Sequence, residues 1–331
     1  MRRRGNKMFF GTENIKIKNF FALCDAIGHT GTCTRKTIAE ITALSYPTVS
    51  KTVELLLDMG IIREKLCGKN YVYSFNEKSY FAVADMRGTF RMTLTDLGGT
   101  ELYSSVHKEA DTFFFDEKLS LFFRDTSILA KRKLPKGKLC GVCVILPSLS
   151  EAYRDTRSVL TSSERLKKLI SSYFNCTNII TVTAADAVTE MCSKKRCLII
   201  LKEPCGVLCK VCGYGCGGLA TLKSVSTTAL GRCRTSEELA KEIACAVGNI
   251  CGVFSPEYIY IDGDRLFSVS AFPRRFKEAL ARFNCVSEDS LPEIICSGGS
   301  LTVTAGARIL RHRYLEDLIA DAKEINNKNK L

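Results

Sequence analysis

TRKTIAEITALSYPTVSKTVELLLDMGII, residues 34–62, predicts two short helices joined by a polar turn. The first helix is expected to begin after an N-cap at Thr34. Its apolar residues at helical spacing would be buried: Ile38, Ala39 and Ile41. The second helix is expected to begin after an N-cap at Ser45, since Pro47 is tolerated in a first helical turn. Its buried residues would be Val49, Val53 and Leu56. This is the pattern of a helix-turn-helix.

A two-stranded hairpin is predicted directly after the second helix. Gly60 is placed to end that helix, and the turn Gly68-Lys69-Asn70 precedes an alternation of aromatic residues, Tyr71, Tyr73 and Phe75. Plain core packing would also accommodate a helix, a turn and an amphipathic helix. The outward positions lack the Glu-Lys pairs of an ordinary solvated helix, however, and the elements come in the order of a winged helix.

The outward face of the second helix carries small or hydrogen-bonding side chains, which are typical of contacts to base edges and phosphates in a major groove. With the basic residues of the first helix and the hairpin, the expected DNA contacts are Arg35, Lys36, Tyr46, Pro47, Thr48, Ser50, Lys51, Thr52, Lys65, Lys69 and Asn70.

The charge of the chain agrees with an anionic partner. The formal net charge is +13, and residues 1–80 hold 13 Lys or Arg against 7 Asp or Glu, a local excess of +6. A basic N-terminal arm would add phosphate contacts, although a short basic terminus is as often only a solvated tail. The arm residues are Arg2, Arg3, Arg4 and Lys7.

With 331 residues, 46% hydrophobic and 25% charged, the chain has the size and composition of a globular protein of two or three domains. No apolar run approaches the roughly 20 residues of a membrane-spanning helix, and the basic N-terminus lacks the apolar stretch of a signal peptide. We therefore expect a cytoplasmic protein without a membrane partner. The 17 cysteines lie mostly in apolar runs, where a thiol behaves as a small buried hydrophobe, so we expect no disulfide framework.

One group of cysteines has the spacing of a metal site. Cys205, Cys209, Cys212 and Cys216 are arranged as C-x3-C-x2-C-x3-C, which would suit zinc or an iron–sulfur cluster. The segment around them alternates like a hairpin, and no histidine is near it in the sequence. We therefore expect no metal and no cofactor, and keep this cysteine group as the weaker alternative.

The pattern changes at Tyr80, where residues 80–106 predict an antiparallel meander of three strands. Helices are expected at 109–129, 162–174, 236–254 and 273–283. Apolar strands are expected at 139–146, 179–183 and 197–201, a glycine-rich hairpin at 206–218, and a buried strand within 255–264. Strand meanders that alternate with helices, repeated twice, predict an α/β domain of two similar lobes around a cleft.

Four stretches of the sequence are those on which a resemblance to a known family rests: LSYPTVSKTVELLLDMGII, ADMRGTFRMTLTDLGG, ELAKEIACAVGNICGVFSPEYIYIDGD and SGGSLTVTAGARIL. In their order and spacing, most of the chain resembles the ROK (repressor/ORF/kinase) family, whose regulators join a winged helix to a sugar-kinase domain of the actin-like ATPase (ribonuclease H-like) fold. The first stretch is close to the DNA-reading helix of the family, and the second stands where members carry D-I-G-G-T followed by two strands. ELAKEIACAVGNICGVFSPEYIYIDGD and SGGSLTVTAGARIL resemble the helix and strand before the second phosphate region and the closing helix. The resemblance implies a winged helix at residues 1–79 and a kinase-like effector and dimerisation domain at 80–331, divided into lobes near residue 186.

The chain departs from the family where the kinases bind ATP and sugar. The D-x-G-G-T turn brings backbone N–H groups to the phosphates of ATP, and here Arg87 replaces its first glycine. The catalytic Asp of N-D-x-N-A aligns with Ala184 or Asp186, and the flanking asparagines are absent under both alignments. Lys202-Glu203-Pro204 replaces a glycine turn, and the sugar-holding residues have no counterpart. The resemblance thus implies a degenerate cleft without a catalytic residue, formed by Asp85, Arg87, Gly88, Thr89 and Asp186.

Two functions fit these residues. The first is a homodimeric transcriptional regulator, expected to be a repressor of carbohydrate-related genes, that binds double-stranded DNA. Its kinase-like domain would not be an enzyme but a sensor of a sugar or sugar-phosphate effector, a dimerisation platform, or both. The second is an active ATP-dependent carbohydrate kinase with an appended DNA-binding module, which would depend on Asp186 as a general base. Because Asp186 also stands where a side chain would cap the following helix, we favour the first.

Overall fold

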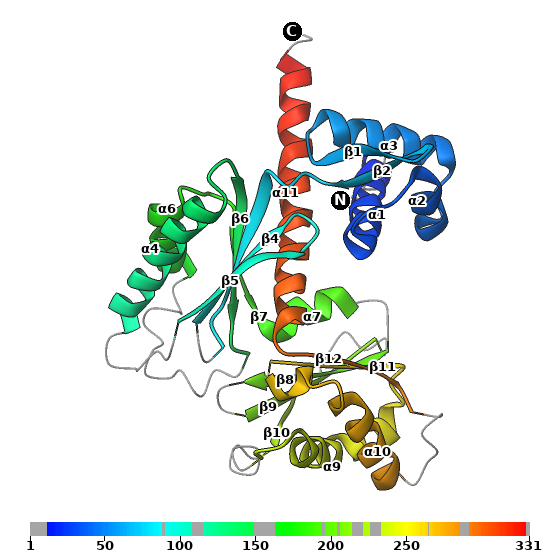
Figure 1. Ribbon diagram of the computed structural model, residues 1–331, viewed down its shortest axis with the longest axis vertical. Coiled ribbons are helices and arrows are strands. Elements are labelled where there is room, and N and C mark those ends of the chain that lie inside the picture. Colours follow the sequence, from blue (N-terminus) through cyan, green and yellow to red (C-terminus); the bar gives the residue numbers. More distant parts are fainter. Residues whose placement is uncertain are drawn as a thin grey trace, which may run out of the picture.

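The computed structural model describes residues 12–87, 90–107, 115–148, 163–192, 196–203, 206–213, 221–225, 233–263, 265–284 and 291–328. The chain begins with helices α1 (Thr12–Thr30), α2 (Arg35–Thr42) and α3 (Tyr46–Asp58), followed by the antiparallel strands β1 (Ile62–Cys67) and β2 (Asn70–Phe75). The two helices and the hairpin predicted for residues 34–75 are present, whereas α1 is not predicted. These five elements, called the N-terminal module below, lie to one side of the rest of the molecule (Figure 1).

Local signals explain where the helices of the N-terminal module begin and end. The Thr34 hydroxyl accepts a hydrogen bond from Thr37 N at 3.1 Å, as an N-cap does. Ser45 occupies the N-cap position of α3, but its hydroxyl bonds to the Thr48 hydroxyl at 2.8 Å and does not cap the backbone. Gly60 follows α3 with a φ of 66°, a left-handed conformation that glycine adopts without a steric cost.

Two side chains of these helices differ in burial from the prediction. Ile41 is 51% exposed, because it lies about 60° around the helix axis from the fully buried Ile38 and α2 ends one residue later. Thr52 is only 7% exposed, because it lies next to Val53 on the covered face of α3. The Thr52 hydroxyl donates to Thr48 O at 2.8 Å, so it is satisfied within the helix.

The first lobe is built on a five-stranded sheet. The predicted meander is formed by β3 (Ser79–Asp85), β4 (Phe90–Asp96) and β5 (Glu101–His107), and β6 (Lys138–Leu146) and β7 (Ile179–Thr183) continue it in parallel, giving the order β5-β4-β3-β6-β7. Helices α4 (Phe115–Lys133) and α6 (Ser163–Phe174) cover one face with side chains such as Leu119, Phe123 and Ile170. The predicted helix 109–129 is present from Phe115 and ends later, at Lys133, while residues 109–114 lie outside the described residues.

The second lobe contains a sheet of the same size. Its strands are β8 (Cys197–Glu203), β9 (Gly206–Cys212), β10 (Thr221–Val225), β11 (Tyr258–Asp262) and β12 (Glu293–Ser297), in the order β10-β9-β8-β11-β12. Helices α9 (Ser236–Phe254) and α10 (Phe272–Asn284) pack on one face, and a short 3-10 helix, η3 (Arg265–Ser268), precedes α10. The bounds of α9 are those predicted, whereas β12 is not predicted.

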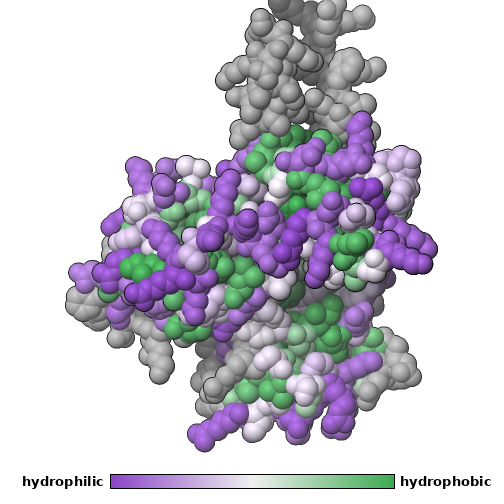
Figure 2. All heavy atoms as spheres, turned by 45° about the horizontal axis from the view of Figure 1, so that its top comes forward, coloured by the Kyte–Doolittle hydropathy of each residue, from purple (hydrophilic) through white to green (hydrophobic). Residues whose placement is uncertain are grey.

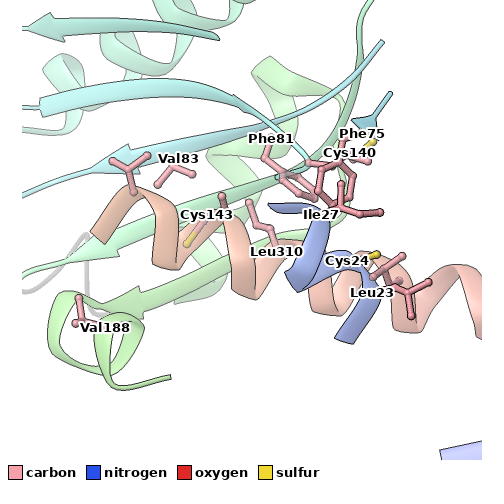
Figure 3. Packing of buried hydrophobic residues seen from close by; sticks show 14 of the residues in the cluster. Leu23, Cys24, Ile27, Phe75, Phe81, Val83, Cys140, Cys143, Val188 and Leu310 are labelled. Carbon is pink, nitrogen blue, oxygen red and sulfur yellow. The ribbon is translucent and has the colours of Figure 1, made fainter. Parts of the chain in front are cut away.

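Two helices lie on the inner faces of the sheets. Helix α7 (Ala184–Cys192) follows β7, and α11 (Ser300–Lys328) follows β12, passes along β3 and β6, and reaches α1 (Figure 1). One hydrophobic cluster includes Ile27 of α1, Phe75 of β2, Cys143 of β6, Val188 of α7 and Leu310 of α11 (Figure 3). The N-terminal module and the two lobes therefore share a continuous core.

The exterior carries mixed side chains. Figure 2 shows mainly hydrophilic residues on the face seen there, with smaller apolar patches between them. Across the part of the chain that the structure describes, every helix is too short or too polar to cross a membrane.

Candidate nucleic-acid interface and interlobe cleft

The outward face of α3 leaves several of the predicted DNA contacts accessible. Tyr46 is 55% exposed, Pro47 and Lys51 are also exposed, and Thr48 and Ser50 are half-buried. Among the described residues, no ion pair involves Lys51. Thr52, in contrast, points into the module and is not part of this face.

The basic residues around α3 differ in how far they are engaged. Arg35 lies 3.9 Å from Glu54 and its guanidinium stands 5.5 Å from the centre of the Tyr73 ring, so it is held against the module. Lys36 is exposed and only loosely paired with Glu40 at 4.0 Å. Lys65, Lys69 and Asn70 are exposed on the hairpin, where Gly68 and Lys69 form the turn between Cys67 and Asn70. Exposed basic and amide groups are thus present on α2 and on the hairpin of the same module as α3.

A second candidate site lies where the two sheets meet. Asp85 is the last residue of β3 and Asp262 is the last residue of β11, so each carboxylate stands at the end of a buried strand in a different lobe. Arg87 bridges them: its Nε and Nη2 atoms donate to the two Asp85 oxygens at 3.0 and 2.7 Å, and Nη2 lies 3.3 Å from Asp262 Oδ2. The Arg87 side chain is 3% exposed. The guanidinium is therefore a buried cation between two carboxylates.

The first turn of α11 completes this arrangement. Gly299 N donates to Asp262 Oδ1 at 2.8 Å, and the Thr302 hydroxyl donates to Asp262 Oδ2 at 2.9 Å and accepts a bond from Arg87. We call Asp85, Arg87, Asp262 and Thr302 the interlobe cluster. A space of about 50 Å³ remains beside it, lined by Asp85, Arg87, Arg91, Gly263, Gly298 and Gly299. The predicted cleft residues Gly88 and Thr89 lie outside the described residues.

Asp186 lies apart from the interlobe cluster. Its carboxylate accepts bonds from the Thr183 hydroxyl at 2.7 Å and from Lys210 Nζ at 2.8 Å, while its amide donates to the Thr183 hydroxyl at 3.2 Å. Partial burial favours a higher pKa for Asp186, but the bonds from Lys210 and Thr183 outweigh it and lower the pKa. The carboxylate is thus ionised and held at the start of α7 by a buried lysine.

The cysteine group does not converge in the part that is described. Cys209 faces the core between the second sheet and α9, whereas Cys212 faces the opposite side of the same sheet, because the two residues are an odd number of positions apart in β9. Burial raises the pKa of Cys209 to about 12, which disfavours the thiolate that a metal would need. Cys205 and Cys216, like Pro204, lie outside the described residues. Lys202 and Glu203 end β8.

Asp262 and Thr302 are the site residues that the sequence analysis misses. A signal for Asp262 exists, because it directly follows the apolar strand residues YIYI and precedes a glycine, as Asp85 follows YFAVA. Thr302 has no such signal, since it is an ordinary helix residue whose partner is 40 positions away.

Comparison with known proteins identifies the fold. No protein-family model matches the sequence, and no curated protein matches it. A solved ROK family transcriptional regulator, described as a homolog of the E. coli MLC protein, is similar with a TM-score of 0.56 and 13% identity, over 92% of this chain and 97% of that one. A ROK glucokinase from Streptomyces griseus is similar with a TM-score of 0.47 and 11% identity, over 70% of this chain and 98% of that one. A ROK hexokinase from Thermus thermophilus is similar with a TM-score of 0.43 and 13% identity, over the same shares of the two chains. Over nearly its whole length, the chain therefore has the fold of a ROK family transcriptional regulator.

Proposed function

We propose that this protein is a DNA-binding transcriptional regulator of the ROK type, with a winged helix at residues 1–79. The observation that carries the proposal is the accessible face of α3, with Tyr46, Ser50 and Lys51, in a module whose hairpin exposes Lys65 and Lys69. A helix inserted in a major groove needs such a face, with donors and acceptors open to base edges and cations near the phosphates. The similarity to a solved regulator extends over 92% of the chain and supports the same conclusion.

We further propose that the kinase-like domain, residues 80–331, does not phosphorylate a sugar. In the related kinases the turn at Asp85 approaches phosphates through backbone N–H groups, but here the Arg87 side chain occupies the space between Asp85 and Asp262. Asp186, the alternative general base, is already bonded to Lys210 and Thr183. A base held by a buried cation has a lowered proton affinity, which weakens it for abstracting a hydroxyl proton.

The domain is proposed to serve as a dimerisation platform and as a sensor for a sugar or sugar phosphate. One recognition helix reads only a few base pairs, whereas two helices related by a twofold axis read an inverted repeat with half-sites about one turn apart or a multiple of that. Small-molecule sites usually have volumes of roughly 300–1,000 Å³, so a ligand at the 50 Å³ space beside Arg87 would require the lobes to separate. Light scattering with a selected operator, and melting-temperature shifts with a panel of sugars and sugar phosphates, test these two roles.

Selection of sequences from a random duplex pool by the full chain tests the DNA-binding proposal. The expected result is an enriched inverted repeat, bound less tightly as salt rises because counterions are released from phosphates. Lys51→Ala should weaken binding about fivefold and reduce the magnitude of the salt slope by about two, one for each recognition helix of the dimer. Lys168→Ala, which removes an exposed lysine of α6 in the first lobe, is the matched control and should leave both unchanged. Failure to enrich any sequence, or equal effects of the two substitutions, would reject the proposal.

A coupled assay for ATP consumption with glucose, N-acetylmannosamine and similar hexoses tests the proposal that the kinase-like domain does not phosphorylate a sugar. We expect no sugar-dependent turnover. Turnover on the order of 1 per second or faster, the ordinary range of enzymes, would favour the active kinase instead.

A further inference from the structure

Helix α11 carries a second polar cluster, which is partly buried and centred on Arg311, nine residues after Thr302 and close to the N-terminal module. Asp25 of α1 accepts hydrogen bonds from Arg308 at 2.6 Å and from Arg311, and His312 lies 3.4 Å from the same carboxylate. We call Asp25, Arg308, Arg311 and His312 the module cluster. Burial alone would raise the pKa of Asp25, but the hydrogen bond with His312 and the charges of Arg311 and Arg308 hold it well below its usual range.

Arg311 is the centre of the module cluster, because it is 4% exposed and contacts three elements besides its own helix. Its guanidinium bonds to Asp25 of α1, donates to Leu97 O in the β4–β5 turn at 3.0 Å, and stands 5.6 Å from the centre of the Phe75 ring in β2. A side chain at Gly28 of α1 would begin 3.1 Å from an Arg311 nitrogen. One buried arginine of α11 therefore fixes α1 and the hairpin against the first lobe.

The part of α11 between the two clusters is tightly packed. Thr302 and Arg311 are about 14 Å apart along the helix axis, at 1.5 Å per residue. Between them Ala305, Ala307 and Leu310 are fully buried, and a Cβ at Gly306 would lie 3.2 Å from both Cys143 Sγ and Val83 Cγ1. Figure 3 shows Leu310 among side chains from α1 and the first sheet. A helix packed this closely moves as a unit, so a shift at one end reaches the other.

We propose that α11 is a rigid link through which the interlobe cluster sets the position of the N-terminal module. The interlobe cluster fixes the first turn of α11 through Asp262, and the module cluster fixes α1 on the same helix. Release of Arg87 would free the start of α11, and the contacts of Arg311 with α1 would loosen in turn. The consequence for DNA recognition rests on the proposed function, but the coupling itself can be measured without DNA.

Hydrogen exchange of the full-length protein, read by mass spectrometry of peptides, tests the link. Arg87→Met keeps an unbranched side chain and removes the guanidinium with its charge. We expect at least tenfold faster exchange in peptides of α1 and of the β4–β5 turn, with no change in α9 and α10, which pack on the far face of the second sheet. The matched control is Arg196→Met, which breaks an exposed pair with Glu257 in the second lobe and should leave α1 unchanged.

A substitution in the module cluster, at the other end of the link, tests the coupling in the opposite direction and does not depend on damage at Arg87. Since coupling between two sites is reciprocal, Asp25→Asn should speed the exchange of the Gly299 and Thr302 amides, which donate to Asp262. The proposal is overturned if Arg87→Met affects only peptides at the cleft, if it speeds α9 and α10 as much as α1, or if Asp25→Asn leaves residues 298–304 unchanged. A protein that shows both effects but selects no DNA would retain the link and lose the proposed function.

Discussion

The outward face of α3 and the interlobe cluster are both polar, but the polar groups are exposed to solvent in the first and bonded to one another in the second. On α3, Tyr46 and Lys51 project into solvent. In the interlobe cluster, Arg87 is 3% exposed and Asp262 is fully buried, and each bonds to groups of the other lobe or of α11. A surface that binds a partner keeps its donors and acceptors available, whereas buried charges must satisfy one another within the protein. The difference agrees with the recognition that we propose for α3 and with a structural role for the cluster.

The largest expected effect that tests this contrast is on folding. Asp262→Ala removes the acceptor of the Gly299 amide, the Thr302 hydroxyl and Arg87, and it leaves a buried cation with one carboxylate fewer. Removing one partner of a buried ion pair costs about 3–5 kcal/mol of unfolding free energy. Urea denaturation measures it. Asp125→Ala, at an exposed pair with Arg124, is the control and should change stability by less than about 0.5 kcal/mol. Equal losses would mean that burial of the cluster contributes little.

The module cluster should give stability that depends on pH. Because the pKa of Asp25 is lowered on folding, its contribution is present above the unfolded pKa of about 3.9 and is lost as pH falls through the folded value. Asp25→Asn should cost about 2 kcal/mol of unfolding free energy at neutral pH, because the hydrogen bonds from Arg308 and Arg311 lose their charged acceptor. The difference in unfolding free energy between the original protein and Asp25→Asn should shrink below about pH 4. A difference that stayed constant down to pH 2 would contradict the role of the carboxylate charge.

On the α3 face the expected effect is smaller and appears in binding. Ser50→Ala removes a half-buried hydroxyl of the outward face and should change the preference between operator variants by about 1 kcal/mol, at the low end of the range for a lost base contact. Folding stability should stay within about 0.5 kcal/mol of the original. Competition binding with single-base operator variants measures the preference. An unchanged ranking of variants would remove Ser50 from base recognition.

The smallest effect is expected at Thr52, which the sequence places among the DNA contacts and the structure places in the module. Thr52→Val keeps the shape of the side chain and removes the hydroxyl that donates to Thr48 O. Stability should change by less than about 1 kcal/mol, and DNA affinity should not change beyond the corresponding loss of folded protein. Thermal unfolding and binding of the same preparation test both. A selective loss of affinity would return Thr52 to the interface.

The sequence predicts the parts of this molecule that depend on local signals. The hairpin follows from Gly68 and alternating aromatic residues. Helix α9 has the predicted bounds, and in the structure a capping box of Thr235 and Glu238 begins it. Ile41 and Thr52 are misplaced, because a helix of eight or thirteen residues packs only a narrow stripe and the pattern alone does not fix its width. Residues that meet across long separations carry no local signal.

The interlobe cluster illustrates that limit. Arg87 is recognisable from the sequence as an obstacle in a glycine turn, but its partner Asp262 is 175 positions away and Thr302 is 215 away. The module cluster spans more than 280 positions, from Asp25 to Arg308 and Arg311. Such pairs follow only from the arrangement of the sheets and of α11, which the composition and periodicity of single segments do not determine.

The short tether of Arg87 has a consequence for any molecule that competes for the same carboxylates. The guanidinium is attached two residues from Asp85, and a group held on so short a segment acts at an effective concentration in the millimolar range or above. A free cation or a phosphate-bound metal present at lower concentration could displace Arg87 only if its interaction with Asp85 and Asp262 were more favourable in free energy than that of the guanidinium. The tethered guanidinium thus competes with dissolved cations for the two carboxylates, and this selectivity follows from the covalent structure of the chain.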